Sequence, residues 1–352
     1  MASLTGNRNR NAAGRRATYP KYESVDGASV RVGLYSDHLY RDGQVGTGYS
    51  KYIYHLTREL RNLGVEVVPL PKGANPKDVD VLHDPAAPWN APLRPRRPLV
   101  VTIHDLFPSL LPQYYGLWIR NLYIQKLRWF THFGQRIVVD SERTREVVQS
   151  VLHPKVPMDV VPLGLEDRFR PVPGEPPETP FVVQVGIHRE IKEPRLTFEA
   201  FEKIADRIPH ELHFVGDARI PWFQSLDEHV RRRPNLQSRV KVYWPGEAGL
   251  PQVYSRATLV VHPTPEEGFG FVPLEALGCG AHVLARAPAV REVLGPMGCY
   301  FEDADSLPDA MLDCLSHPPK STLEDRVARA RLFTFRKTAE RTLQAYEAAR
   351  AG

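Results

Sequence analysis

Glu267 and Glu275 are separated by seven residues, among them Gly268 and Gly270. An apolar run, residues 258–262, precedes the first glutamate, and a short helix is expected to carry the second one. Another apolar run follows that helix. Strand, glycine-containing turn, helix and strand form the unit from which parallel sheets are built. The two carboxylates should therefore bracket a turn at one edge of such a sheet, where both can face a single ligand.

This turn combines a site for an anion with two carboxylates. Where Gly268 and Gly270 lead into the helix, unpaired backbone N–H groups and the positive end of the helix dipole can face an anion. A carboxylate beside an anion site is electrostatically unfavourable, and hydroxyl groups to bind would explain its presence. Phosphate together with a polyol is typical of a sugar nucleotide. The alternative is a helix that carries two surface carboxylates without a ligand.

The segment from Glu267 to Gly280, with apolar strands on both sides, closely resembles the donor-site signature of the retaining group-one glycosyltransferases. These enzymes carry a Glu-x7-Glu motif on a two-domain fold called GT-B. The resemblance implies that Glu267 contacts hydroxyls of the transferred sugar and that Glu275 binds the ribose. It also implies that backbone amides after the glycines hold the distal phosphate, which assigns to the donor site Gly268, Phe269, Gly270, Phe271 and Val272.

A second glycine pair, Gly46 and Gly48, follows the first expected strand, residues 30–35. The helix behind this pair ends at Gly64 and has apolar residues at spacings of four and three. Glycines also open helices simply to permit a tight turn. The family, however, places a Gly-rich loop here, across the cleft from the donor phosphates, and this favours a donor-binding role. The apolar stripe of the helix consists of Tyr49, Ile53, Leu56, Leu60 and Leu63.

His104 follows a buried strand that begins at Leu99. Ligands of open α/β sheets bind at the carboxyl ends of strands, where this histidine falls. An isolated histidine at a strand end would usually make a structural hydrogen bond to a loop. The segment from Ile103 to Pro108 is nevertheless similar to a family motif whose histidine faces the transferred sugar, so we expect that role for His104. Asp105 could equally be a turn or cap residue.

The second domain is expected to begin with a strand that ends at Gly186, followed by a loop to Lys192. In the family this strand end and loop contact the donor, and the loop supplies an arginine and a lysine to the diphosphate. Lys192 matches the lysine, but Ile191 stands where the arginine is usual. Arg189 is close enough in the sequence to replace it. A cation here would stabilise the charge that develops on the leaving diphosphate.

The resemblance extends from about Val30 to Ala349 and implies an α/β architecture with two Rossmann-like parallel-sheet domains facing each other across a cleft. A proline-dense stretch interrupts the alternation of strands and helices and is expected to be the linker. The last helix resembles one that crosses back to the first domain. The expected organisation is a basic, flexible tail (1–28), an acceptor-side domain (29–170), the linker (171–180), a nucleotide-sugar-binding domain (181–334) and the returning helix (335–352).

Composition argues against several other classes. The net charge of +5 falls to about +2 without the basic tail, so we do not expect a nucleic-acid partner. No apolar run approaches the ~18 residues that span a bilayer, and no signal peptide is apparent. The three cysteines do not suggest a disulfide framework, so a reducing, cytoplasmic environment is expected. They are Cys279, Cys299 and Cys314.

Residues 113–135 are rich in aromatic and basic side chains. Basic amphipathic helices can lie on membrane interfaces, so contact with the cytoplasmic face of a membrane is one interpretation. We favour the simpler one, in which the apolar side chains pack on the sheet and the basic ones are solvated. The apolar set is Leu117, Ile124, Leu127 and Phe130, and the basic set is Arg120, Lys126 and Arg128.

The sequence thus predicts a retaining, metal-independent hexosyltransferase without a cofactor. Its expected catalytic residues are His104, Glu267, Lys192 and Arg189. The resemblance favours GDP-mannose as the donor, with UDP-linked sugars as the alternative, and a glycan, lipid-linked or protein-linked hydroxyl as the acceptor. Two other classes remain open. The imperfect Arg/Lys loop is compatible with a catalytically degenerate sugar-nucleotide-binding partner protein, and paired Rossmann units also occur in nicotinamide-dependent oxidoreductases, although the first strand lacks their Gly-x-Gly-x-x-Gly.

Overall fold

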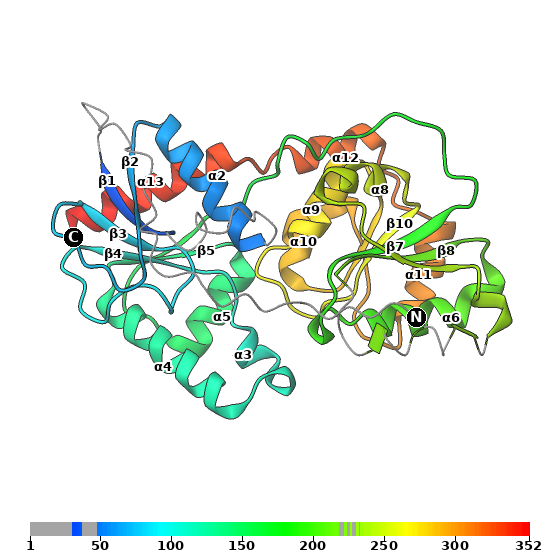
Figure 1. Ribbon diagram of the computed structural model, residues 1–352, viewed down its shortest axis with the longest axis horizontal. Helices are drawn as coiled ribbons and strands as arrows, with labels where there is room; N and C mark the ends of the chain where they lie inside the picture. The colour runs from blue at the N-terminus through cyan, green and yellow to red at the C-terminus, as the bar shows by residue number, and fades with distance from the viewer. Residues whose placement is uncertain (1–29, 37–47, 218–221, 224–225, 227–229, 232) are drawn as a thin grey trace, which may run out of the picture.

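The computed structural model describes residues 30–36, 48–217, 222–223, 226, 230–231 and 233–352. These residues form two six-stranded sheets flanked by helices (Figure 1). The strand orders are β2-β1-β3-β4-β5-β6 and β12-β11-β10-β7-β8-β9, and all pairs in both sheets are parallel. The predicted α/β architecture with two parallel-sheet domains is confirmed.

The N-terminal domain is built on the first sheet. Its β4 is apolar except for Thr102 and is fully buried, as expected for a parallel strand covered on both faces. The strands are β1 (Arg31–Tyr35), β2 (Glu66–Leu70), β3 (Val81–Asp84), β4 (Leu99–Ile103), β5 (Arg136–Val139) and β6 (Met158–Val160). The helices are α2 (Gly48–Asn62), α3 (Phe107–Leu110), η1 (Pro112–Tyr114), α4 (Leu117–Phe133) and α5 (Glu142–Leu152).

The C-terminal domain is built on the second sheet, whose β10 is likewise buried at every position. Its strands are β7 (Phe181–Ile187), β8 (Glu211–Asp217), β9 (Val240–Tyr243), β10 (Leu259–His262), β11 (Val283–Ala285) and β12 (Cys299–Tyr300). Its helices are η2 (Glu190–Lys192), α6 (Pro194–Ile204), η3 (Ala205–Arg207), η4 (Pro234–Leu236), η5 (Glu247–Gly249), α8 (Leu250–Arg256), α9 (Phe271–Gly278), α10 (Pro288–Leu294), η6 (Gly295–Met297), α11 (Leu307–Ser316) and α12 (Leu323–Ala330).

The last helix, α13 (Phe335–Ala351), lies in the N-terminal domain, beside α2 and the first sheet (Figure 1). Its Tyr346 hydroxyl bonds to Nδ1 of His83 on β3 at 2.7 Å. Near the start of the helix, the Thr338 hydroxyl donates to the Pro162 carbonyl at 2.8 Å. The chain therefore passes between the domains twice, once after β6 and once before α13.

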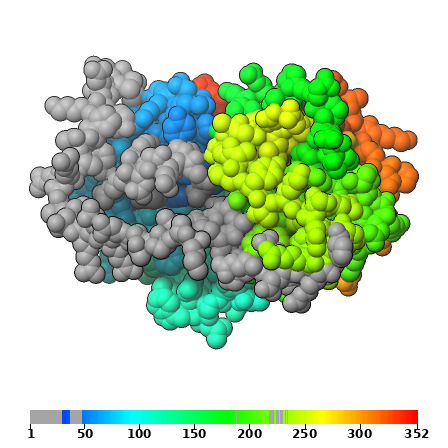
Figure 2. All heavy atoms as spheres, turned by 45° about the vertical axis from the view of Figure 1, so that its right-hand side comes forward, coloured from blue at the N-terminus to red at the C-terminus, as the bar shows by residue number. Residues whose placement is uncertain are grey.

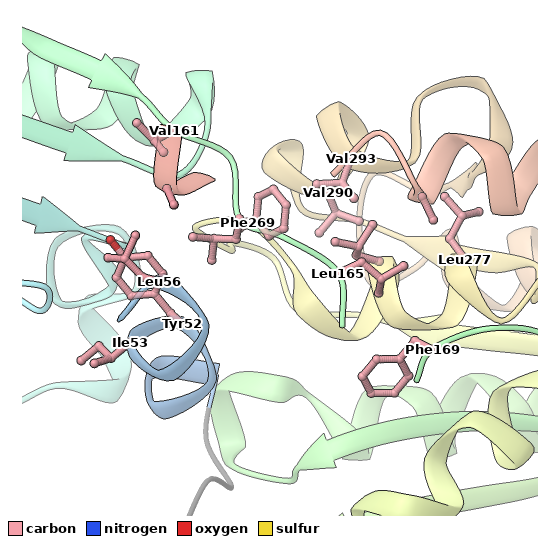
Figure 3. Packing of buried hydrophobic residues seen from close by; sticks show 14 of the residues in the cluster. Tyr52, Ile53, Leu56, Val161, Leu165, Phe169, Phe269, Leu277, Val290 and Val293 are labelled. Carbon is pink, nitrogen blue, oxygen red and sulfur yellow. The ribbon is translucent and has the colours of Figure 1, made fainter. Parts of the chain in front are cut away.

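One apolar cluster continues across the boundary between the domains. Figure 3 shows Tyr52 and Leu56 of α2 on one side and Val290 and Val293 of α10 on the other, with Phe269 between them. All five side chains are nearly inaccessible to solvent. Burial of such side chains stabilises by about 1.5–3 kcal/mol each, so this shared core holds the two domains together.

The structure corrects two details of the sequence analysis. Leu117 does not pack on the sheet, because 72% of its surface is exposed, whereas Leu127 and Phe130 are buried as expected. Cys299 and Cys314 form a disulfide between β12 and α11, contrary to the expectation that the cysteines stay unpaired.

Among the described residues, no helix is long and apolar enough to cross a membrane.

Candidate functional site

A cleft of about 1430 Å³ lies between the two domains and is lined by residues of both. Figure 2 shows the surface where blue atoms of α2 meet yellow-green atoms of the C-terminal domain. The carboxyl ends of β4, β7 and β10 open into this cleft, as the general rule for ligand sites in open α/β sheets requires. Of the predicted site residues, all those that the structure describes line the cleft; Gly46 lies outside the described residues.

Glu267 follows β10 and is held by two partners from its own domain. Its Oε1 accepts hydrogen bonds from the Lys192 ammonium and from Nε2 of His262, the latter at 3.0 Å. Burial alone would raise the pKa of Glu267, but the Lys192 charge and the His262 hydrogen bond lower it to about 2. Burial lowers the pKa of His262, so the imidazole is neutral and donates from Nε2. Glu267 is therefore an ionised, oriented acceptor inside the cleft.

The glycine turn after Glu267 requires glycine at two positions. Gly270 has a φ of 101° and immediately precedes α9, so a side chain there would be strained. Gly268 lies against the N-terminal domain, where a Cβ would be 1.8 Å from the His104 carbonyl oxygen. The first amides of α9, at Phe271 and Val272, are at the helix end that attracts an anion. Gly48, at the start of α2, faces Phe271 across the cleft.

The loop after β7 brings two cations into the cleft. Lys192 pairs with Glu267, whereas the guanidinium of the exposed Arg189 has no ion pair or hydrogen bond with the described residues. Ile191 is buried, so its side chain belongs to the core and not to the ligand site. Gly186, the residue before the last one of β7, has a φ of 141°. Arg189 is thus available for a negatively charged group in the cleft.

His104 is fixed within the N-terminal domain. Its Nδ1 lies 2.6 Å from a carboxylate oxygen of Asp140, and its Nε2 lies 2.8 Å from the Pro85 carbonyl oxygen. Both partners are acceptors, which suits an imidazolium with two N–H donors. Burial disfavours that charge, but Asp140 raises the pKa of His104 above its usual value. With both nitrogens engaged, a ligand would meet the ring edge or the backbone carbonyl of this residue.

Asp105 makes a turn and also faces the cleft. Its Oδ1 accepts the Phe107 amide N–H at 3.1 Å, and burial raises its pKa. Of the two roles considered from the sequence, Asp105 has that of a turn residue, because the N-cap of α3 is Leu106. Aromatic and apolar side chains of the N-terminal domain surround this end of the cleft: Trp89, Phe107, Tyr115, Ile119 and Tyr123.

Glu275, on α9, meets a residue that the sequence analysis did not select. Its Oε1 accepts from the Lys51 ammonium of α2 at 3.0 Å, and its Oε2 accepts from the Tyr254 hydroxyl at 3.2 Å. The Lys51 ammonium also lies 3.2 Å from Glu247 and 3.7 Å from Glu166. Burial raises the pKa of Glu275 and Lys51 counteracts it. A buried cluster of charges thus joins the domains beside the cleft.

The N-terminus of α5 makes the other polar junction between the domains. The Ser141 hydroxyl donates to the Gly268 carbonyl at 2.7 Å, and the Thr144 hydroxyl does so at 3.1 Å. The Glu292 carboxylate accepts the backbone N–H groups of Glu142 and Arg143 at 2.9 and 2.7 Å. These contacts hold the glycine turn against the N-terminal domain.

Sequence reasoning missed several of these groups. Lys51, Asp140, His262 and Tyr254 are each defined by contacts with residues distant in the sequence or in another element. The sequence alone gives no signal for Lys51, because its burial on the helix that follows Gly48 is visible only in the structure. A buried lysine requires a negative partner, but the sequence does not say which one.

Two family models match the chain. Residues 179–317 match the model described as "Glycosyl transferases group 1", and residues 69–169 match "Glycosyltransferase Family 4". One match falls on the second sheet and the other on much of the first. Each model covers less than half of the chain, so these two segments are similar to group 1 and family 4 glycosyltransferases.

Curated relatives match part of the chain. The D-inositol 3-phosphate glycosyltransferase of Mycolicibacterium smegmatis is 28% identical over 207 residues, which are 56% of this chain and 47% of the relative. The phosphatidylinositol N-acetylglucosaminyltransferase gpi3 subunit of Schizosaccharomyces pombe is 30% identical over 220 residues, 58% of this chain and 46% of the relative. The matched region therefore spans about half the length of these proteins.

Solved structures share the fold over nearly the whole chain. Sucrose-phosphate synthase from Thermosynechococcus elongatus is 19% identical with a TM-score of 0.73, covering 90% of this chain and 98% of that one. Anabaena HepE in complex with UDP-glucose is 16% identical with a TM-score of 0.65, covering 90% and 100%. At these identities the likeness concerns the GT-B fold alone.

Proposed function

We propose that the protein is a retaining glycosyltransferase that moves a hexose from a nucleotide-diphosphate donor to an acceptor hydroxyl. The observation that carries this proposal is the arrangement around Glu267. An ionised carboxylate for sugar hydroxyls is paired with the Lys192 ammonium, and the exposed Arg189 and the first residues of α9 line the same cleft. Acceptors for a polyol and donors for a diphosphate thus converge in one cleft.

In the reaction, the bond between the anomeric carbon and the diphosphate oxygen breaks, and a bond forms between that carbon and the acceptor oxygen. The acceptor proton passes to the departing diphosphate, and attack on the face that the diphosphate leaves gives retention. Lys192, Arg189 and the amides of Phe271 and Val272 would stabilise the negative charge on the leaving group. Glu267 would orient the sugar ring.

His104 would contribute positive charge and shape at the wall where the sugar lies. Its raised pKa favours the imidazolium, but Asp140 and the Pro85 carbonyl already take both N–H groups. We therefore assign it to positioning, with its backbone packed against Gly268. The reaction requires no metal or cofactor in this proposal, because the chain's own cations and helix amides face the diphosphate.

Mannose from GDP-mannose is the donor we favour, on the similarity of the His-Asp-Leu-x-Pro and Glu-Gly-Phe-Gly segments to mannosyltransferases. The names of the relatives add inositol phosphate and phosphatidylinositol as acceptors to compare, and N-acetylglucosamine as another transferred sugar. A cytoplasmic location, where nucleotide sugars are available, fits this function. Peripheral contact with a membrane would suit a lipid-linked acceptor.

The test is a thermal-shift panel of GDP, UDP, ADP and their sugar conjugates, together with nicotinamide dinucleotides. A ligand at about 100 times its Kd stabilises the folded state by about 2.7 kcal/mol, which such an assay detects. We expect one nucleotide to shift the wild type, and turnover of its sugar conjugate to fall at least about a hundredfold in Lys192→Ala. Lys203→Ala, an exposed lysine on α6, is the matched control.

The outcomes separate the candidate functions. Binding without turnover of any sugar conjugate would instead support the degenerate partner protein. Absence of a shift with any of these nucleotides, or an unchanged rate in Lys192→Ala, would contradict the proposal. A shift with nicotinamide dinucleotides alone would favour an oxidoreductase.

A further inference from the structure

The ion pair between Lys51 and Glu275 joins the two domains inside the cleft. Lys51 belongs to α2 of the N-terminal domain and Glu275 to α9 of the C-terminal domain, 224 positions apart in the chain. Both side chains are almost fully buried, with 8% and 4% of their surface exposed. Because its partners belong to different domains, the pair exists only while the domains are together. Removing one partner in the assembled protein would leave the other as an uncompensated buried charge.

The Lys51 ammonium is surrounded by carboxylates. It donates a hydrogen bond to Glu275 at 3.0 Å and forms ion pairs with Glu247 at 3.2 Å and Glu166 at 3.7 Å. Lys51 also lines the cleft, but these three partners already balance its charge. We therefore expect Lys51 to act on a bound nucleotide mainly through Glu275, the carboxylate to which it is hydrogen-bonded.

Glu275, in contrast, keeps capacity for a ligand. Each of its oxygens has one protein donor, Lys51 on Oε1 and Tyr254 on Oε2, and a carboxylate oxygen accepts two hydrogen bonds. The two donors fix the plane of the carboxylate, and Glu275 lines the cleft. Two lone pairs therefore remain, held in a fixed orientation, for a pair of neighbouring hydroxyl groups.

The charge on Glu275 depends on Lys51. Burial raises the pKa of Glu275, the Lys51 ammonium lowers it, and the carboxylates of Glu166 and Glu247 raise it again. The pKa of Tyr254 is well above its usual value, so its hydroxyl stays protonated as a donor. The other ionisable groups of this cluster are Arg168, which pairs with Glu166 and Glu247, His55 near Glu166, and Cys279.

We propose that Lys51 is a positioning residue for the ribose subsite: from the opposite domain, it keeps the Glu275 carboxylate ionised and oriented toward the two ribose hydroxyls. This inference rests on the nucleotide-sugar function proposed above. It adds that ribose recognition requires both domains, although the Glu-x7-Glu motif lies wholly in one of them. Full recognition of the ribose of a donor would require α2 and α9 to be in contact.

The test compares UDP and GDP with their 2′,3′-dideoxy analogues, by calorimetric titration of the wild type and of Lys51→Met at pH 6 and pH 8. The wild type should prefer the nucleotide that it binds over the dideoxy analogue by about tenfold or more at both pH values. In Lys51→Met the pKa of Glu275 rises, so the carboxylate protonates as the pH falls. The preference should shrink several-fold at pH 8 and be nearly lost at pH 6.

Three further variants separate this role from a purely structural one. Lys51→Arg keeps the charge and should retain most of the ribose preference and its flat pH profile. Arg58→Met removes an exposed charge from the same helix and should match the wild type. Lys51→Met combined with Glu275→Gln leaves no titrating group at this position, so the preference should be weak and independent of pH. In this double variant both substituted side chains are neutral, so it can be measured even if Lys51→Met alone fails to fold.

Several outcomes would overturn the inference while leaving the proposed function intact. One is an unchanged ribose preference in Lys51→Met at both pH values. Another is tighter nucleotide binding in that variant, which would make Lys51 a competitor of the ribose. A wild type that binds the nucleotide and its dideoxy analogue equally would remove the ribose subsite itself. A wild type that binds neither nucleotide would instead contradict the proposed function, and the inference with it.

Discussion

At the scale of single residues, the environment of Glu267 shows how the cleft keeps a buried carboxylate charged. The side chain is only 13% exposed, which by itself would favour the neutral acid. Lys192 and His262 outweigh this effect and lower its pKa to about 2. The group is therefore ionised in the folded protein at pH values where it would be protonated in the unfolded chain.

This lowered pKa predicts a change in acid stability. Since the folded-state pKa of about 2 lies below the ordinary value of 4.5, the ionised Glu267 contributes stability that is complete above about pH 4.5 and is lost as the pH falls towards 2. In urea unfolding, Glu267→Gln should be less stable than the wild type at pH 7, and the gap should narrow below pH 4.5. Glu199→Gln, in an exposed pair on α6, should show a small gap throughout, and a constant gap for Glu267→Gln would contradict the prediction.

Gly268 gives a second prediction at this scale. A Cβ at this position would lie 1.8 Å from the carbonyl oxygen of His104, and backbone on both sides leaves little room to adjust. Gly268→Ala should lower the free energy of unfolding by about 1–3 kcal/mol and reduce turnover. Gly116→Ala is the control, because it has no atoms within 4 Å of the added Cβ and an ordinary φ of −62°. If Gly268→Ala and Gly116→Ala had the same free energy of unfolding, the domains would not be in contact at Gly268 in solution.

The candidate site could be predicted where its residues are contiguous in the sequence. Glu267, Glu275 and the glycines between them form one turn, so local spacing was enough to select them. The partners that set their charge were not accessible in this way. Lys51 reaches Glu275 only because the two domains come together, and Asp140 meets His104 only because β4 and β5 are neighbours in the sheet. Single-sequence patterns do not contain such contacts.

At the scale of elements, α5 connects the domains through its N-terminus. Ser141 caps this helix, since its hydroxyl accepts the Thr144 amide N–H at 3.1 Å. Two further amides of this helix end, those of Glu142 and Arg143, are satisfied by Glu292 of α10 in the other domain. A carboxylate is favourable at a helix N-terminus, so this contact stabilises both the helix and the closed arrangement.

Removing the Glu292 carboxylate should weaken the contact between the two domains. In Glu292→Ala the two amides lose their acceptor, and we expect a cost of about 1 kcal/mol. Small-angle X-ray scattering should then show a larger radius of gyration in the absence of nucleotide. Glu302→Ala, an exposed glutamate of the same domain, should leave the radius unchanged. An unchanged radius in both variants would mean that the apolar core alone sets the arrangement of the domains.

Most elements were predictable because their hydrophobic periodicity is strong. The expected stripe of α2 is buried at Ile53, Leu56 and Leu60, and β4 is buried at every position. The failures concern exposed or short elements. Leu117 is apolar yet exposed at the start of α4, because apolar character alone does not determine burial, and α12 was not anticipated among charged residues. Its capping box at Thr322 and Asp325 is the signal that could have indicated it.

At the scale of the whole molecule, the N-terminal domain is completed by the last helix of the chain. Tyr346, Ala345 and Ala349 of α13 are buried in the cluster that also contains Leu56 and Leu60 of α2. The Tyr346 hydroxyl further satisfies the buried His83. Without α13, this part of the apolar core would be open to water.

A fragment of residues 30–170 should therefore be unstable by itself. We expect it to bind the dye ANS and to lack a cooperative thermal transition, because the face that α13 covers is exposed. Fusing residues 335–352 to its end through a flexible linker should restore the transition. A fusion carrying Tyr346→Ala is the matched control and should restore it poorly. Cooperative unfolding of the fragment alone would contradict this account.

The return of α13 also has a consequence for synthesis in the cell. Ribosomes deliver the N-terminal domain first, and domains usually fold in the order in which they emerge. Here the strands of the first sheet are made long before Tyr346, which their His83 requires as a partner. The first domain therefore remains incompletely folded until the second domain and α13 have been translated. Chaperones that shield apolar surface should matter most during this interval.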